Sequence, residues 1–344
     1  MINWGSRCRI AQDITEAAGM TPLLRLRKVP VGPQAICGKL ELMNPSSSLK
    51  DRVLRHAVAR AEERGDLRPG MTILEASTGS TGIATAMIGA VKEYPVIIVM
   101  PEGMSEERKA SMRAYGAQLV LTPGGESDVD LCLEKVQELK RDQPGKFWEL
   151  GQFSNKDNIE AHYLTTGSEI WEQTEGRVDV FVASQGSGGT VSGVGKFLKE
   201  KNPKVKIYAV EPAECPILSG GSWGPHQIEG IGDGFIPDNL DLDYLDGVVT
   251  VSSQDSIAMA RRLAQEEGVL CGISSGCNVV AANKLSRVLS NTEMIVTMIN
   301  DTGMRYFSTP LFGHEPTADI PEREHPIREQ DRQNLARRNL HIVH

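Results

Sequence analysis

The segment Asn44-Pro45-Ser46-Ser47-Ser48-Leu49-Lys50-Asp51-Arg52 places one lysine between a turn of small residues and a helix-like run. Much later in the chain, the strand-like residues 178–184 lead directly into Gln185-Gly186-Ser187-Gly188-Gly189-Thr190. A glycine-rich turn between a strand and a helix presents consecutive backbone N–H groups, an arrangement that binds a phosphate group. The two segments therefore predict one reactive amine and one phosphate cradle within a single α/β chain.

An amine and a phosphate cradle are the two parts that pyridoxal 5'-phosphate needs, because a lysine forms a Schiff base with its aldehyde. Each part has a plainer interpretation. Most lysines are solvated, and a glycine turn can serve close packing of a helix on a sheet. The dinucleotide fingerprint GxGxxG does not fit, since its third glycine would fall at Val191, and no Gly-Lys-Ser/Thr ending marks a P-loop.

Two further segments carry hydroxyl groups at expected helix starts. Glu75-Ala76-Ser77-Thr78-Gly79-Ser80-Thr81-Gly82 joins a strand to a helix and forms a possible site for a phosphate or a carboxylate. Gly272-Ile273-Ser274-Ser275-Gly276-Cys277 also precedes a helix, and a hydroxyl there could bond a heteroaromatic nitrogen. When each segment is taken alone, an ordinary helix N-cap is the favoured interpretation.

Composition excludes several classes of protein. The chain has 344 residues and a net charge of −8, which argues against a nucleic-acid-binding surface. Its six cysteines show no CxxC pair and no metal spacing, so we expect free thiols, no metal site and a cytoplasmic location. The first thirty residues do not resemble a signal peptide. Apolar runs stay below the ~18 residues of a membrane span, so no membrane contact is expected.

Strand-like and helix-like runs alternate along the chain, which predicts an α/β fold with two mostly parallel sheets flanked by helices. The expected strands form one group at 71–76, 95–100 and 117–121, and a second at 178–184, 205–210 and 294–299. Expected helices include residues 52–63, 106–115 and 254–267. The predicted domains are a smaller one at 41–155, a larger one at 1–40 plus 156–312, and a charged tail at 313–344 that is either a peripheral helix or a partly disordered end.

Taken together, these segments resemble the cysteine synthase (O-acetylserine sulfhydrylase) and cystathionine β-synthase family of fold type II pyridoxal phosphate enzymes. The resemblance extends from Thr21-Pro22-Leu23 to Arg305-Tyr306-Phe307-Ser308-Thr309. Besides the segments already quoted, it includes the motifs Met100-Pro101-Glu102, Gln152-Phe153-Ser154-Asn155, Thr165-Thr166-Gly167, Val210-Glu211-Pro212 and Glu229-Gly230-Ile231-Gly232. It implies the same fold, the tryptophan synthase β-subunit-like one, and the same cofactor.

The resemblance also implies a role for each matching residue. Lys50 corresponds to the Schiff-base lysine, which also moves the α-proton. The cofactor phosphate would lie on Gly186, Ser187, Gly188, Gly189 and Thr190, and its pyridine nitrogen at Ser274. Ser77, Thr78, Gly79, Thr81 and Gln152 would surround the substrate carboxylate, and Gly230 would line the mouth of the site.

One position departs from the family pattern. The family has Ser-Gly-Asn-Thr-Gly where this chain has Thr78-Gly79-Ser80-Thr81-Gly82, so Ser80 replaces the asparagine that contacts the ring oxygen of the cofactor. Serine is shorter and can donate one hydrogen bond, directly or through water. We therefore expect Ser80 to bind the cofactor and to influence which substrate is used.

The function that the resemblance implies is β-replacement on an O-activated serine, with cysteine formed from O-acetylserine or O-phosphoserine and sulfide. Alternatives are another β-replacement or a β-elimination, as in cystathionine synthesis, other β-substituted alanines or a desulfhydrase. A catalytically silent family member that acts as a binding partner is a further alternative, against which the retained Lys50 argues. A homodimer and a serine acetyltransferase-type partner are also implied.

Overall fold

The computed structural model describes residues 10–125, 128–313, 327–338 and 340–344. The larger of its two sheets has seven strands in the order β1-β2-β10-β7-β8-β9-β11. Only the β1–β2 pair is antiparallel; each later neighbour in this order is parallel. The strands are β1 (Leu23–Arg25), β2 (Ala35–Leu40), β7 (Val180–Ser184), β8 (Lys206–Pro212), β9 (Gly247–Val251), β10 (Met294–Ile299) and β11 (His341–Val343).

The smaller sheet has four parallel strands in the order β5-β4-β3-β6. They are β3 (Thr72–Ala76), β4 (Val96–Pro101), β5 (Gln118–Thr122) and β6 (Phe147–Glu149). Every residue of β3 is buried, and so is every residue of β9 in the larger sheet. Burial is continuous along these strands rather than alternating, and includes the polar Thr72, Glu75 and Thr250, because helices cover both faces of a parallel sheet.

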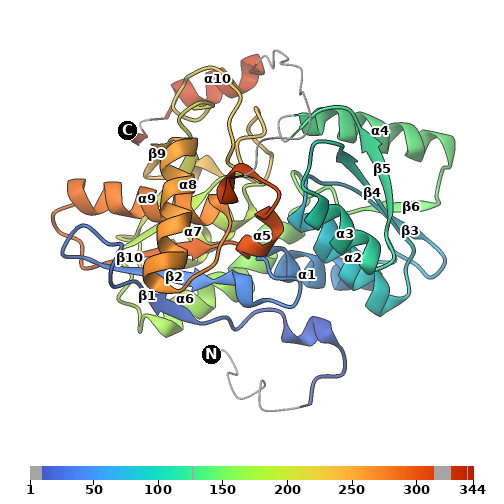
Figure 1. Ribbon diagram of the computed structural model, residues 1–344, viewed down its shortest axis with the longest axis horizontal. Coiled ribbons are helices and arrows are strands. Elements are labelled where there is room, and N and C mark those ends of the chain that lie inside the picture. The colour runs from blue at the N-terminus through green and yellow to red at the C-terminus, as the bar shows by residue number, and fades with distance from the viewer. Residues whose placement is uncertain (1–9, 126–127, 314–326, 339) are drawn as a thin grey trace.

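Helices cover both faces of each sheet. α8 (Ser253–Arg262) and α9 (Ile273–Val288) share one core with the larger sheet, and α6 (Ser168–Gln173) and α7 (Gly189–Lys201) share the other. The smaller sheet packs on one face against α1 (Lys50–Arg64), α2 (Ser80–Lys92) and α3 (Glu106–Ala114), and on the other against α4 (Val129–Asp142). In Figure 1 the smaller sheet with α2, α3 and α4 forms one side of the molecule.

Two helices continue as π-helical turns. The short α5 (Asp157–Ala161) runs into the π turn His162–Gly167, and α8 runs into Leu263–Glu267. Close packing surrounds the first of these turns, because a Cβ at Gly193 of α7 would lie 2.4 Å from the Ile159 carbonyl oxygen. π-helical turns are frequent near functional sites, and this one begins at His162, whose ring contacts Thr190.

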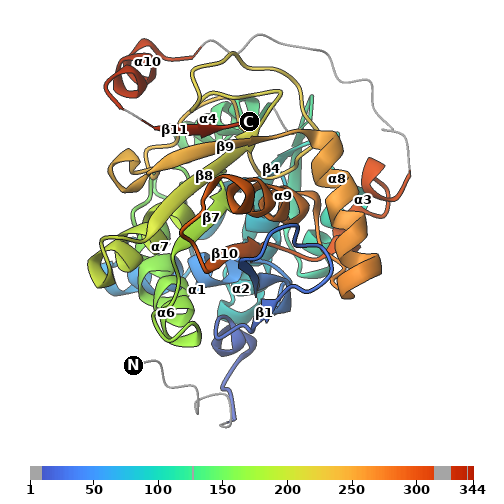
Figure 2. The ribbon, with the colours of Figure 1, turned by 90° about the vertical axis from the view of Figure 1, so that its left-hand side faces the viewer.

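The expected α/β architecture is found, and the six expected strands occur within two residues of their predicted ends. Strands β1, β2, β6, β9 and β11 were not expected from the sequence. The charged tail, expected as a helix or a partly disordered end, provides α10 (Glu329–Ala336) and the edge strand β11, which lies beside β9 (Figure 2). Residues 314–326 of that tail lie outside the described residues. The domain limits 41–155, 1–40 plus 156–312, and 313–344 stay a prediction.

Candidate active site

A cavity lies between the two sheets, at the carboxyl ends of strands from both of them. Strand β3 ends just before Ser77, β7 ends at Ser184 and β10 ends just before Asn300, and all three of these residues line the cavity. Ligands of open α/β sheets bind beyond the carboxyl ends of the strands. Of the predicted site residues, all but Gly189 line it: Lys50, Ser77, Thr78, Gly79, Ser80, Thr81, Gln152, Gly186, Ser187, Gly188, Thr190, Gly230 and Ser274.

Lys50 is the first residue of α1, and its neighbours hold that helix start in place. The Asp51 carboxylate accepts a hydrogen bond from the Ser46 backbone N–H at 2.6 Å and a second from the Ser46 hydroxyl. The Leu49 N–H donates to the carbonyl of Asn300 at 3.0 Å, which ties the turn to the end of β10. The small serines of the quoted segment therefore form a turn that connects Lys50 to the larger sheet.

Arg52 anchors the same helix through a buried network of charges. Its guanidinium bonds both carboxylate oxygens of Glu41 at 2.6 and 2.8 Å and both of Glu169 at 2.6 and 2.7 Å. Lys39 forms a third ion pair, with Glu169 at 2.6 Å. Although burial opposes it, the charge of Arg52 lowers the pKa of Glu41 to about 2. These contacts fix the helix start two residues from Lys50.

The Lys50 amine is prepared to act as a nucleophile. Burial disfavours its ammonium form and lowers its pKa to about 8, while the nearby Asp233 and Asp301 act in the opposite direction. An amine must be neutral to attack a carbonyl carbon. At neutral pH, a pKa near 8 leaves roughly a tenth of the side chain neutral, far more than the fraction for a solvated lysine.

The glycine loop, residues 186–190, ends at the N-terminus of α7. Among the described residues, no acceptor is found for the backbone N–H groups of residues 187–190. Gly188 has φ +81°, and a Cβ there would lie 2.6 Å from the Leu240 backbone nitrogen. The loop thus presents donors at a helix N-terminus, as a phosphate site requires, and only glycine fits Gly188 without strain.

Side chains from α5 and the following π turn support the glycine loop. Asn158 donates to the Ser187 hydroxyl at 3.0 Å, and a Cβ at Gly189 would lie 2.0 Å from Asn158 Oδ1. The Thr190 hydroxyl shares a hydrogen bond of 3.2 Å with His162 Nε2. Burial, with a contribution from Lys50, lowers the pKa of His162 to about 3, so its ring is neutral. Gly189 therefore contributes by close packing and by its backbone.

The hydroxyl loop, residues 77–81, stands at the start of α2. The Ser77 hydroxyl accepts from the N–H groups of Gly79 at 3.1 Å and Gly82 at 2.8 Å, so this side chain shapes the loop. Thr81 donates to Gln152 Oε1 at 2.6 Å, and Gln152 Nε2 donates to the Ala76 carbonyl at 3.1 Å. These bonds hold Thr81 and Gln152 together at one wall of the cavity.

Ser80 has a partner that the sequence did not indicate. Its hydroxyl accepts a hydrogen bond from Arg305 Nη1 at 2.7 Å, and Arg305 also donates to the Ser46 carbonyl. Arg305 is buried, and burial is the main cause that lowers its pKa. A hydroxyl that accepts from a guanidinium keeps its own proton free to donate toward the cavity.

Ser274 lies in the first turn of α9 and is held by an amide network. Asn300 Nδ2 donates to the Ser274 hydroxyl at 3.0 Å and to the Ser184 hydroxyl at 3.1 Å. Asn278 in turn donates to the Met298 carbonyl at 2.9 Å. The helix N-cap is Gly272 without a side-chain bond, so Ser274 is not the N-cap. Its hydroxyl is left oriented at the cavity wall.

Besides Lys50, five ionisable residues of the described cavity lining were given no role from the sequence: Arg108, Glu229, Asp233, Asp301 and Tyr306. The Tyr306 hydroxyl donates to Asp301 Oδ2 at 2.9 Å, and the Arg108 guanidinium lies 4.7 Å from the centre of the Tyr306 ring. Burial is the main cause that raises the pKa of Asp301. Glu229 and Tyr306 stand inside quoted motifs, and that position was the signal that could have identified them.

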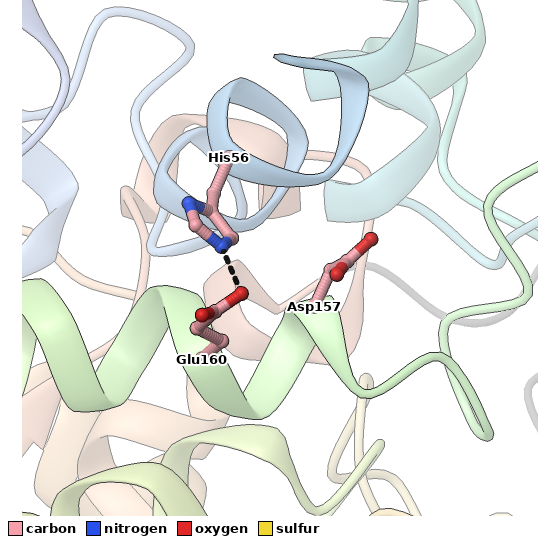
Figure 3. A group of neighbouring side chains, drawn as sticks. All are labelled: His56, Asp157 and Glu160. Atoms are coloured by element: carbon pink, nitrogen blue, oxygen red, sulfur yellow. Dashed lines mark hydrogen bonds and ion pairs between the residues drawn. The ribbon is translucent and has the colours of Figure 1, made fainter. Parts of the chain in front are cut away.

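A separate cluster of His56, Asp157 and Glu160 joins α1 to α5 (Figure 3). His56 Nε2 and Glu160 Oε2 lie 2.8 Å apart. Arg64 Nη2 bonds Asp157 at 2.7 Å, and Arg60 Nε lies 3.7 Å from Glu160. Arginines thus neutralise both carboxylates, and the cluster is best understood as a set of ion pairs between two helices rather than as a set of metal ligands.

Known proteins are similar to this chain over most of its length. Residues 14–301 match the family model described as pyridoxal-phosphate dependent enzyme. Cysteine synthase 3 of Caenorhabditis elegans is 47% identical over 310 residues, which cover 89% of this chain and 91% of that protein.

The chain belongs to the family of pyridoxal-phosphate dependent enzymes.

Solved structures of similar proteins share the fold as well. The crystal structure of cysteine synthase (OASS) from Entamoeba histolytica has a TM-score of 0.85 at 40% identity and covers 97% of each chain. A hydrogen sulfide-producing enzyme from Fusobacterium nucleatum has a TM-score of 0.83 at 40% identity, over 86% of this chain and all of that one. The family and the fold class expected from the sequence are therefore confirmed.

The residues present fit the cofactor of this family. The N–H groups at the start of α7, which have no acceptor among the described residues, suit its phosphate, and a partly neutral Lys50 suits its aldehyde. The Ser274 hydroxyl suits a neutral ring nitrogen. In the part of the chain that the structure describes, no helix is long and apolar enough to cross a membrane.

Proposed function

We propose that the protein catalyses β-replacement on an O-activated serine, with sulfide as the second substrate and cysteine as the product. The observation that carries this proposal is that Lys50, the one lysine of the described cavity lining, shares the cavity with the glycine loop and the hydroxyl loop, in a chain so similar to cysteine synthases. The leaving group is either acetate from O-acetylserine or phosphate from O-phosphoserine. The proposal rests on geometry and on similarity together.

Each predicted site residue has a role in this proposal. Lys50 holds the cofactor covalently, then accepts the α-proton of the substrate and later returns it. The glycine loop (Gly186, Ser187, Gly188, Gly189 and Thr190) binds the phosphate, and Ser80 with Ser274 contacts the ring. The substrate carboxylate lies against Thr78, Gly79, Thr81 and Gln152, with Ser77 shaping that loop and Gly230 at the mouth.

The environment of the ring nitrogen supports chemistry at the β-carbon. When bound, the cofactor takes up the electron density released as the α-proton leaves. Ser274 is neutral and cannot stabilise a pyridinium charge as an aspartate would. Long-lived delocalisation into the ring is then less favoured, and loss of the β-substituent is preferred over transamination. Similarity to a hydrogen sulfide-producing enzyme favours one second candidate, a reaction that starts from cysteine and releases sulfide.

A homodimer, a serine acetyltransferase-type partner and a cytoplasmic location are parts of the same proposal. The homodimer and the partner are proposed because the resemblance to cysteine synthases implies both. The five cysteines that the structure describes are buried and free. Free thiols of this kind fit a reducing compartment.

Replacement of Lys50 tests the proposal. We expect Lys50→Ala to lower turnover by at least about 10³-fold, because one residue supplies both the covalent link and the proton transfer. The matched control is Lys135→Ala, at a partly exposed lysine far along the chain that pairs with Glu138. Assays should combine O-acetylserine, O-phosphoserine, serine and cysteine, each with and without sulfide, with circular dichroism to check folding. Substantial turnover by folded Lys50→Ala would overturn the proposal.

A further inference from the structure

An ion pair between the two halves of the chain forms part of the cavity wall. Arg108 of α3 pairs with Glu229, which lies in the loop before Gly230. The Arg108 side chain is 3% exposed and that of Glu229 14%. A Cβ at Gly79 would lie 2.6 Å from Arg108 Nε, so the guanidinium packs directly on the hydroxyl loop. Arg108 is thus fixed next to the place where the substrate is proposed to bind.

The charges that line the cavity are unequal. Among the described lining residues, Lys50 and Arg108 are the lysine and arginine side chains, while Glu229, Asp233 and Asp301 are acidic. In the proposed function Lys50 is bound to the cofactor. Arg108 is engaged by Glu229 and by the face of the Tyr306 ring. Both cationic side chains of the described lining, Lys50 and Arg108, therefore already have partners before a substrate binds.

The two possible leaving groups differ mainly in charge. An O-acetyl group is neutral, whereas a phosphate monoester carries about −1.5 to −2 charges at pH 7. A phosphoryl group that loses its hydration in a binding site needs cationic hydrogen-bond donors. The planar guanidinium of arginine fits its oxygens best. The carboxylates of Glu229 and Asp233 face the same space and would repel it.

We propose that the Arg108–Glu229 pair is a specificity determinant that makes the site accept an uncharged acyl leaving group and refuse a phosphoryl one. This proposal rests on the proposed function and narrows its substrate class. Glu229 masks the guanidinium that a phosphoryl group would otherwise use. In the favoured reaction, the Cβ–O bond breaks with its electron pair on the departing acetate, and sulfide forms the new Cβ–S bond.

The parent enzyme gives the first test. We expect kcat/KM for O-acetylserine to exceed that for O-phosphoserine by roughly 100-fold or more, the scale set by an unpaired charge in a desolvated site. O-Phosphoserine should also inhibit the O-acetylserine reaction only weakly. Equal use of both substrates would overturn the proposal. Use of neither substrate by enzyme that holds its cofactor would instead contradict the proposed function.

Glu229→Gln is the decisive variant, because it keeps the side-chain shape and removes the masking charge. The ratio of kcat/KM for O-phosphoserine to that for O-acetylserine should rise by about tenfold or more, and O-phosphoserine should inhibit at lower concentration. Glu229→Asp keeps the carboxylate and should stay near the parent ratio. An unchanged ratio in Glu229→Gln overturns the proposal. Equal changes for both substrates also overturn it, since Arg108 would then act on the carboxylate that both share.

Discussion

Arg52 offers a quantitative test of how the helix that carries Lys50 is held in place. Replacement of Arg52 by methionine keeps most of the side-chain volume and removes a guanidinium that bonds Glu41 and Glu169. Both carboxylates remain buried, and Lys39 is left as their only nearby cation among the described residues. An uncompensated buried carboxylate is costly whatever the original pair contributed.

The expected loss of unfolding free energy is about 3–5 kcal/mol, the range for removing one partner of a buried ion pair. For 344 residues that unfold in one transition, the melting temperature falls by roughly 4–7 °C. The sign of the pH dependence follows from Glu41. In the parent its folded-state pKa, about 2, lies below the unfolded value of 4.5, so the paired carboxylate stabilises the fold above pH 4.5. Without Arg52 its pKa rises, and the deficit of the variant grows as pH increases.

The assay is urea denaturation of the cofactor-saturated enzyme, at about pH 5 and about pH 8. Arg262→Met is the control, because Arg262 at the end of α8 forms a half-exposed pair with Glu266 of the following π turn, and exposed pairs contribute little to stability. A loss for Arg52→Met no larger than that of Arg262→Met would refute the reasoning. So would a deficit that shrinks as the pH rises.

Three further outcomes are expected. Gly188→Ala should weaken cofactor binding sharply in a fluorescence titration, because a Cβ at φ +81° meets the Leu240 backbone; unchanged affinity would mean that the loop is only a packing turn. Ser80→Asn should change either the relative rates in the substrate panel or the pH titration of the visible cofactor band, because it alters the acceptor of Arg305. Cofactor affinity should stay nearly unchanged, and identical profiles for parent and variant would show that the replacement is neutral. Burial raises the pKa of Glu75 to about 8, above the unfolded 4.5, so stability falls as pH rises between these values; Glu75→Gln should remove that decline in urea midpoints, and an unchanged slope would contradict the assignment.

The strands and helices next to the site could be predicted because their signals are local. Strand β10 was expected at its observed residues, since a buried parallel strand is a short continuous apolar run. β11 was missed because its three residues carry no such run and gain their strand conformation from pairing with β9. Whether so short a segment forms an edge strand depends on its hydrogen bonds to a strand that is distant in the sequence.

The sequence by itself identified Lys50, the glycine loop and the hydroxyl loop as candidate elements of the site. Their chemistry depends on consecutive residues: small side chains for a turn, backbone N–H groups for an anion, and one amine at a helix start. Only the tertiary structure decided which charges surround them. Arg108 meets Glu229, Arg305 meets Ser80 and Arg52 meets Glu169 across long separations in the chain. Such pairs leave no spacing in the sequence, because packing of the two sheets and their helices, rather than local backbone geometry, brings the partners together.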